Sequence, residues 1–132
     1  MTSKHTDIAP IHLYGIPNCD TVRKSRAWLT EHDIEVVFHD LKKSPPAAAD
    51  IASWLKFVPL ELLINKKGTT WRALTPEQKT AAADPVTAIA LISSQPTLIK
   101  RPLLDMSDKT GSQHVSVGYS AAQFAGIFGT PS

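Results

Sequence analysis

Three features of this 132-residue sequence predict an α/β fold with the element order β-α-β, helical insertion, β-β-α. A short apolar run at 11–14 precedes a helical pattern over about 21–32 and a β-rich run at 34–39. Helical spacing and capping signals fill residues 45–95. Alternating apolar and polar residues then return between 97 and 119, before a last helical segment.

The composition is that of one ordinary globular domain, which we place at residues 11–128 after a disordered leader at 1–10. A net charge of +2 without a dense basic block gives no support for nucleic-acid binding. Apolar runs are too short for a membrane span, and no signal peptide precedes them, so we expect a cytoplasmic protein. Its single cysteine excludes an internal disulfide and fits a reducing compartment.

The first unit is predicted to be a right-handed βαβ crossover, with parallel strands at 11–14 and 34–39. Gly15, Pro17 and Asn18 end the first strand, and the helix begins at Asp20 or Thr21. The inner face of that helix is predicted to contain Val22, Ser25 and Leu29, with Trp28 alongside.

The insertion is predicted to begin at Pro45 and Pro46 with a helix that Pro59 ends. A short helix at 60–64 and a loop at 69–72 follow. The inner positions of the first of these helices are Ile51, Trp54, Leu55 and Val58.

Two capping signals predict the remaining helices of the insertion. Thr75, Pro76 and Gln78 form a capping box, and Asp84-Pro85 repeats the signal. The helix after Asp84 is predicted to run to Pro96, with Val86, Ile89 and Ala90 on one shared face.

The last third is predicted to contain strands at 97–99 and 102–104, then a turn at 107–112 and a strand at 114–119 that complete a hairpin. Ser120 and Gln123 form a second capping box. This box opens a final helix with Phe124, Ile127 and Phe128, which ends before Gly129.

Cys19 lies in the turn between the first strand and the first helix, where open α/β sheets place their sites. Free N–H groups of a helix N-terminus favour a thiolate and can hold an anion. Arg23, Lys24 and Arg26 follow within two turns, whereas Asp20 opposes the thiolate unless it turns away to cap the helix. The alternatives are a small buried cysteine without chemistry and arginines on a solvated face.

Three motifs in the same order resemble those of the ArsC/Spx family, and most closely its YffB-like branch. They are the turn at 14–21 (YGIPNCDT), the loop at 65–72 (NKKGTTWR) and the segment at 95–102 (QPTLIKRP). The resemblance covers nearly all of residues 11–128. It implies a thioredoxin-like fold, with a four-stranded mixed sheet, helices on both faces and a helical insertion.

The resemblance also implies roles for individual residues. Cys19 matches the nucleophilic or redox-active cysteine, and Arg23 matches the arginine one turn after it. Arg101 matches the arginine that reaches an oxyanion or a glutathione mixed disulfide, and Pro102 matches the cis-proline beside the cysteine. Arg72 is a candidate for a second anion contact. The candidate substrate-binding residues are Asn18, Thr21, Lys24, Arg72 and Pro102.

Some family features are replaced in this chain. Arsenate reductases of the family carry a histidine where this chain has Gly15, a glycine where it has Asp20, and a further arginine near the last strand, which argues against arsenate as the substrate. Spx-type regulators sense oxidation through a Cys-x-x-Cys pair, whose second position is Val22 here. An intramolecular switch of that kind is therefore excluded.

Two functions are consistent with these residues. The first is a thiol-dependent oxidoreductase, in which one cysteine forms a mixed disulfide or reduces an oxyanion, without a bound cofactor. Glutathione is then the co-substrate, glutathione or glutaredoxin the partner, and a protein disulfide or an oxyanion the substrate. The second is a non-catalytic, Spx-like protein that binds RNA polymerase or another partner. The five histidines show no metal-ligand spacing, and we expect a monomer.

Overall fold

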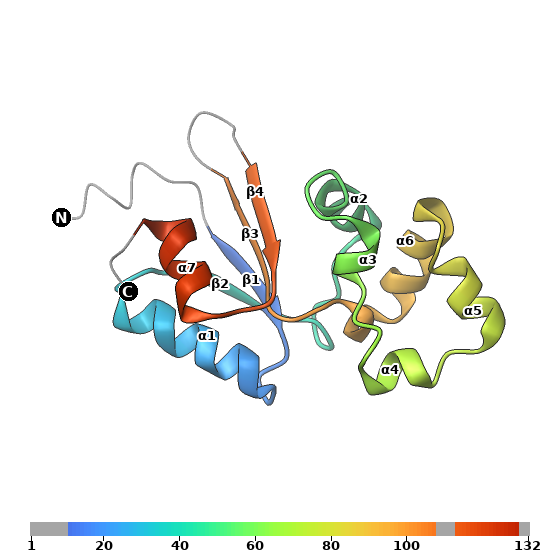
Figure 1. Ribbon diagram of the computed structural model, residues 1–132, viewed down its shortest axis with the longest axis horizontal. Coiled ribbons are helices and arrows are strands. Elements are labelled where there is room, and N and C mark those ends of the chain that lie inside the picture. The colour runs from blue at the N-terminus through green and yellow to red at the C-terminus, as the bar shows by residue number, and fades with distance from the viewer. Residues whose placement is uncertain (1–10, 108–112, 130–132) are drawn as a thin grey trace.

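The computed structural model describes residues 11–107 and 113–129. A four-stranded sheet with two helices lies at one end of the molecule, and a group of short helices lies at the other (Figure 1). The expected disordered leader at 1–10, and positions 108–112 of the expected turn, lie outside the described residues. The strands are β1 (His12–Gly15), β2 (Val37–Asp40), β3 (Leu103–Ser107) and β4 (Gln113–Val117).

The strand order in the sheet is β2-β1-β3-β4. Strand β1 pairs in parallel with β2 and antiparallel with β3, and β3 pairs antiparallel with β4. This arrangement confirms the predicted α/β class, the βαβ unit, the hairpin and the mixed sheet. The third strand continues to Ser107 instead of ending at Leu104.

Helices α1 (Asp20–Glu31) and α7 (Ala121–Phe128) cover one face of the sheet (Figure 1). The predicted inner face of α1 is confirmed, because Val22, Ser25, Trp28 and Leu29 are all buried. The hydroxyl of Ser25 donates to the carbonyl oxygen of Val22 at 2.7 Å, which satisfies the polar group inside the core.

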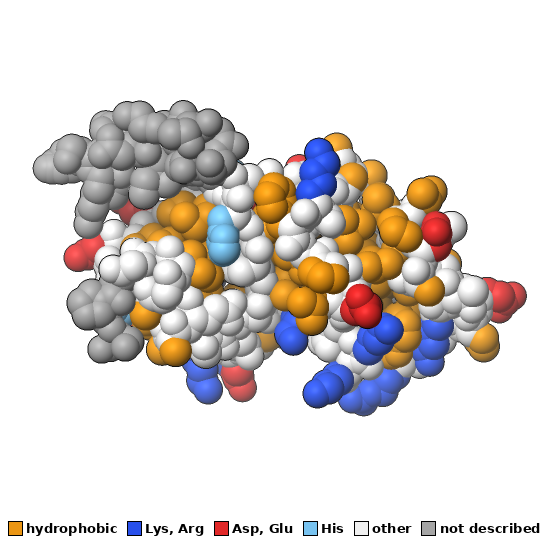
Figure 2. All heavy atoms as spheres, turned by 45° about the horizontal axis from the view of Figure 1, so that its top comes forward, with side chains coloured by type: hydrophobic (Ala, Val, Ile, Leu, Met, Phe, Trp, Pro, Cys, Tyr) orange, Lys and Arg blue, Asp and Glu red, His pale blue; other side chains and the backbone are white. Residues whose placement is uncertain are grey.

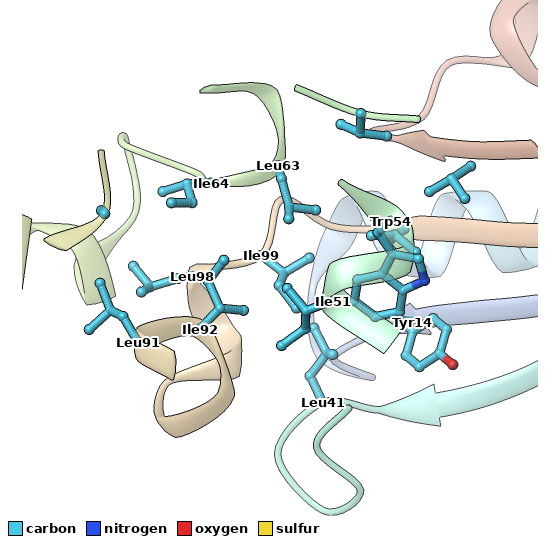
Figure 3. Close-up of a cluster of buried hydrophobic side chains, with 14 of the residues drawn as sticks. Tyr14, Leu41, Ile51, Trp54, Leu63, Ile64, Leu91, Ile92, Leu98 and Ile99 are labelled. Carbon is cyan, nitrogen blue, oxygen red and sulfur yellow. The ribbon is translucent and has the colours of Figure 1, made fainter. Parts of the chain in front are cut away.

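The insertion packs against the opposite face of the sheet through a second core (Figure 3). Tyr14, Leu103 and Val115 of the sheet share this core with Trp54 and other insertion residues. The insertion consists of α2 (Ala48–Trp54), α3 (Leu60–Leu63), α4 (Thr69–Arg72), α5 (Pro76–Ala81), α6 (Pro85–Ser94) and the 3-10 helix η2 (Pro96–Leu98).

Trp54 joins the insertion to the sheet by both apolar and polar contacts. Its side chain is fully buried, and its indole Nε1 donates to Oδ2 of Asp105 at 2.8 Å. The Asp105 Oδ1 accepts from Nε2 of Gln113 at 3.0 Å, and the ring of Tyr14 meets Trp54 edge-on at 4.8 Å. Because β3 and β4 supply the polar partners, the position of α2 depends on the completed hairpin.

Two local predictions for the insertion are wrong. The loop predicted at 69–72 is the helical turn α4, in which the N–H of Ala73 donates to the carbonyl of Thr69 at 3.0 Å. The strand predicted at 97–99 is replaced at 97 and 98 by η2, whose first residue is Pro96, and Ile99 forms only a single β-bridge, with Ile64. A proline at a first helical position has its φ preset for a helical turn, and this local preference prevailed over β propensity.

The predicted face of α6 is also wrong. Val86 is 77% exposed, whereas Ala88, Leu91 and Ile92 are buried. Because apolar residues occur around most of this helix, periodicity did not identify the side that packs against α2.

The helix caps follow the sequence more closely. Thr75 and Gln78 form the predicted box, with bonds of 3.1 and 2.8 Å. Ser120 accepts from the Gln123 N–H at 3.0 Å, but the Gln123 amide donates to the carbonyls of Val117 and Gly118 instead of reaching back to Ser120. The second box is therefore half formed.

Candidate functional site

Cys19 occupies the N-cap position of α1, immediately after the turn that follows β1. Its N–H donates to the carbonyl of Ile16 at 3.1 Å, and its carbonyl accepts from the Arg23 N–H at 2.9 Å. The side chain is partly exposed and makes no capping hydrogen bond. These contacts fix the backbone of the cysteine and leave its thiol uncommitted, which agrees with the expected position at the helix terminus.

A cavity of about 380 Å³ opens beside this thiol. Four cationic side chains and one carboxylate line it, together with polar and apolar groups, so the cavity attracts anions. Its lining residues are Cys19, Thr21, Glu61, Leu62, Ile64, Asn65, Lys66, Lys67, Lys100 and Arg101.

A short antiparallel contact brings the insertion to the cysteine. Ile64 forms an isolated β-bridge with Ile99. The N–H of Asn65 donates to the carbonyl of Leu98, and the N–H of Lys100 donates to the carbonyl of Leu63, each at 2.8 Å. This bridge holds the two basic segments of the cavity, Lys66-Lys67 and Lys100-Arg101, beside each other.

Arg101, to which the resemblance assigns a contact with an anion or a mixed disulfide, lines the cavity, and its peptide bond to Pro102 is cis. The guanidinium is anchored by Nη1, which donates to the carbonyl of Thr97 at 2.7 Å. Its buried Nε finds no hydrogen-bond partner among the described residues. Pro102 is buried and does not line the cavity, so it shapes the site through the backbone.

Arg23, which follows Cys19 by one helical turn, pairs with a carboxylate on its own helix. Its guanidinium forms an ion pair with the carboxylate of Asp20, and the two side chains are 56% and 79% exposed. Arg23 is not among the residues that line the cavity. The carboxylate of Asp20, which was expected either to oppose the thiolate or to cap the helix, makes no cap bond and pairs with Arg23.

Of four other candidate residues, one lines the cavity and three do not. Thr21 lines the cavity, whereas Asn18 and Lys24 are exposed and outside its lining. Arg72 is also outside the lining, and its Nη2 donates to the carbonyl of Lys67 at 2.7 Å. This bond supports the backbone of the basic segment, a different role from the direct anion contact that was expected.

Several charged residues that line the cavity were not predicted from the sequence. Glu61, Lys66, Lys67 and Lys100 were not proposed as site residues, although all four line the cavity with Cys19. Lys66 and Lys67 lie within one of the motifs that carry the resemblance, and Lys100 lies within another. Motif membership was the available signal, and it did not reveal which side chains face the thiol.

A second group of titratable residues lies on β1 and β2. His12 Nδ1 and His39 Nε2 are 2.8 Å apart, and the Tyr14 ring stacks on His39 at 4.4 Å. Burial lowers the pKa of His39 below 6.5, with a further contribution from His12, and Asp50 opposes the shift. Burial, reinforced by Asp50 and Asp105, raises the pKa of Tyr14 to about 12.

Metal binding and membrane insertion find no support within the described ranges 11–107 and 113–129. These residues contain no cluster of three or more histidine, cysteine or acidic side chains placed to hold a metal ion. The same part of the chain has no helix with the length and apolar character needed to span a membrane.

The ArsC family model matches residues 14–127 of the chain. A solved YFFB protein is 36% identical, with a TM-score of 0.77 over 88% of this chain and 96% of its own. An arsenate reductase (ArsC) related protein from Brucella melitensis is 38% identical, with a TM-score of 0.65 over 91% of this chain and 95% of its own. The expected thioredoxin-like fold is thereby confirmed.

Curated relatives include proteins of two kinds. An uncharacterised protein of Haemophilus influenzae is 34% identical over 118 residues, which are 89% of this chain and 98% of the relative. The global transcriptional regulator Spx of Streptococcus pyogenes is 27% identical over 96 residues, which are 71% of this chain and 70% of the regulator.

Proposed function

The chain belongs to the ArsC family, and from this membership and the site we propose that it is a glutathione-dependent thiol oxidoreductase. The observation that carries the proposal is the placement of Cys19 in one cavity with Lys66, Lys67, Lys100 and Arg101. A thiolate beside four cations is suited to react with an anionic sulfur compound.

The proposed reaction has two thiol-disulfide exchanges. The Cys19 thiolate attacks one sulfur of a disulfide, a new S–S bond forms, and the old bond breaks, with its electron pair leaving on the released thiolate. Since Cys19 is the single cysteine, an external thiol must then attack the mixed disulfide. Glutathione supplies that thiol, becomes oxidised and regenerates the Cys19 thiolate.

The surrounding residues have distinct roles in this proposal. Arg101 and the three lysines attract the anionic groups of the disulfide and of glutathione. The N-terminus of α1 favours the Cys19 thiolate, which attacks in the first exchange and is released from the mixed disulfide in the second. Arg23 acts indirectly, because its ion pair with Asp20 reduces the repulsion between that carboxylate and the thiolate.

A coupled assay tests the proposal: reduction of hydroxyethyl disulfide by glutathione, monitored through glutathione reductase and NADPH. Cys19→Ser should abolish turnover and leave the folded structure intact. Lys100→Ala should lower kcat/KM severalfold, whereas Lys56→Ala, an exposed lysine outside the cavity, should not. Full turnover in the Cys19→Ser variant would refute the mechanism.

Reduction of an oxyanion is a second reaction for the same thiol. The name of the Brucella melitensis protein suggests arsenate, but Gly15 and Asp20 replace the residues that arsenate reductases of this family carry. The assay is therefore repeated with arsenate in place of the disulfide. We expect turnover with the disulfide alone, and the reverse result would reassign the substrate.

Binding to RNA polymerase is the alternative function, and the similarity to Spx favours it. In that case the protein should elute with purified RNA polymerase in gel filtration, and Cys19→Ser should still bind. Val22 occupies the second position of the Cys-x-x-Cys pair, so binding would not respond to an intramolecular disulfide. A stable complex together with absent turnover would favour this function over the reductase.

A further inference from the structure

We propose that Glu61 selects substrates with an ammonium group, so that the cavity accepts a small zwitterionic disulfide with more carboxylates than amines. This inference rests on the proposed reductase function, because it concerns the molecule that reacts with Cys19. The observation that carries it is the mixed charge of the cavity wall, where one carboxylate lies among four cationic side chains.

The charges of the cavity are available to a ligand. Glu61 makes no ion pair or hydrogen bond with any other described residue, although four cations line the same cavity. Lys67 and Lys100 likewise have no side-chain ion pair within the described part of the chain. Lys66 contacts the face of Trp71, with its Nζ at 5.4 Å from the ring centroid.

The two signs of charge come from different parts of the fold. Glu61 lies in the first turn of α3, whereas the cations belong to the segments Lys66-Lys67 and Lys100-Arg101. A ligand with its sulfur at Cys19 therefore meets carboxylate-binding groups on two segments and an ammonium-binding group on a third. The neighbouring Leu62 and Ile64 add an apolar surface to the same wall.

The size of the cavity suits a small molecule. Its volume of about 380 Å³ lies near the lower end of the range for ligand pockets, roughly 300 to 1,000 Å³. A short peptide-like disulfide fits this volume better than a folded protein does. The charge pattern complements two carboxylates and one ammonium group on the half that remains bound to Cys19.

The test compares two disulfides that differ in the ammonium group. Oxidised glutathione carries it, whereas its form acetylated on both amino groups keeps the carboxylates and loses the positive charge. The rate of mixed-disulfide formation on Cys19 is followed by intact-protein mass spectrometry. In this step the attacked S–S bond breaks, and one half of the probe leaves as the free thiolate.

The preference for oxidised glutathione, measured as the ratio of its rate to that of the acetylated probe, should be about threefold larger in the wild-type protein than in Glu61→Gln, the size expected for one exposed ion pair. The comparison between proteins is the readout because the acetylated probe is more negative, and the four cations attract it more strongly in both proteins. Glu77→Gln, which changes an exposed glutamate outside the cavity, should preserve the preference. Uncharged hydroxyethyl disulfide should react equally with the wild-type protein and both variants.

Two failures are distinguishable. Mixed disulfides that form at the same relative rates in wild-type and Glu61→Gln protein would refute the role of Glu61 and leave the reductase function standing. Absence of a mixed disulfide with all three probes would refute the reductase function, and the role of Glu61 with it.

Discussion

Gly15 is the last residue of β1, just before the turn that contains Cys19, and we expect that a larger side chain does not fit at this position. A Cβ atom at this position would lie 2.7 Å from Cγ2 and 3.0 Å from Cγ1 of Val22. Val22 is fully buried on α1, so its branched side chain has little room to move. The φ angle of Gly15 is not positive, and the requirement therefore comes from packing and not from backbone conformation.

The substitution Gly15→Ala should lower the free energy of unfolding by about 1–2 kcal/mol. Overpacking a core costs about 1–3 kcal/mol, and the reduced entropy of the unfolded chain offsets about 0.4–1 kcal/mol. Val22→Ala alone should cost about 2 kcal/mol, because two buried methyl groups are lost. The double variant should be more stable than the sum of these losses predicts, by about 1–2 kcal/mol, since the new methyl group enters the vacated space.

Urea unfolding of the four proteins measures this coupling. Gly126→Ala is the matched control, because a Cβ there meets nothing within 4 Å and the residue is exposed on α7. That variant should gain about 0.5–1 kcal/mol from helix propensity. Additive losses within about 0.5 kcal/mol, or no loss in Gly15→Ala, would refute the steric explanation. The same clash explains why the histidine of arsenate reductases could not simply replace Gly15.

The remaining predictions concern the contacts between the insertion and the sheet and the titration of the sheet. Trp54→Phe should lower the free energy of unfolding by about 2–4 kcal/mol, because it removes the hydrogen bond to the Asp105 carboxylate and leaves a void. Urea unfolding measures this loss. The control is Trp71→Phe, which breaks no hydrogen bond of the described residues and should lower the free energy of unfolding by less. Because the pKa of His39 is lowered, the folded protein binds fewer protons than the unfolded chain near pH 6.5. The contribution of His39 to stability is therefore complete above pH 6.5 and is lost as the pH falls below that value. Thermal unfolding between pH 7.5 and 5 should show this loss in the wild-type protein, and a smaller loss in His39→Phe; an equal slope in both would rule out His39 as its source.

The βαβ unit, with its helix, and the hairpin could be predicted because local patterns and tertiary packing agree there. The buried face of α1 follows directly from the spacing of Val22, Ser25 and Leu29. The box formed by Thr75 and Gln78 needs no distant contact, so the sequence was sufficient to place it. Positions of this kind depend on neighbours three or four residues away.

Other segments depended on partners far along the chain. The buried side of α6 was determined by its packing within the insertion, which exposes Val86 and buries Leu91 and Ile92. Gln123 satisfies the carbonyls at the end of β4 instead of its own helix cap. In each case a tertiary contact competed with a local preference and prevailed.

The sequence by itself determined that a thiol, Cys19, lies at a strand-to-helix turn, and motif resemblance added Arg101. Only the tertiary structure decided which charges accompany that thiol. The bridge between Ile64 and Ile99 brings Lys66, Lys67 and Glu61 of the insertion to the cavity, while Arg23 pairs with Asp20 and lies outside it. Glu61 and Arg101, which are 40 residues apart, acquire a common site only through such pairing, because sequence spacing does not specify distance in space.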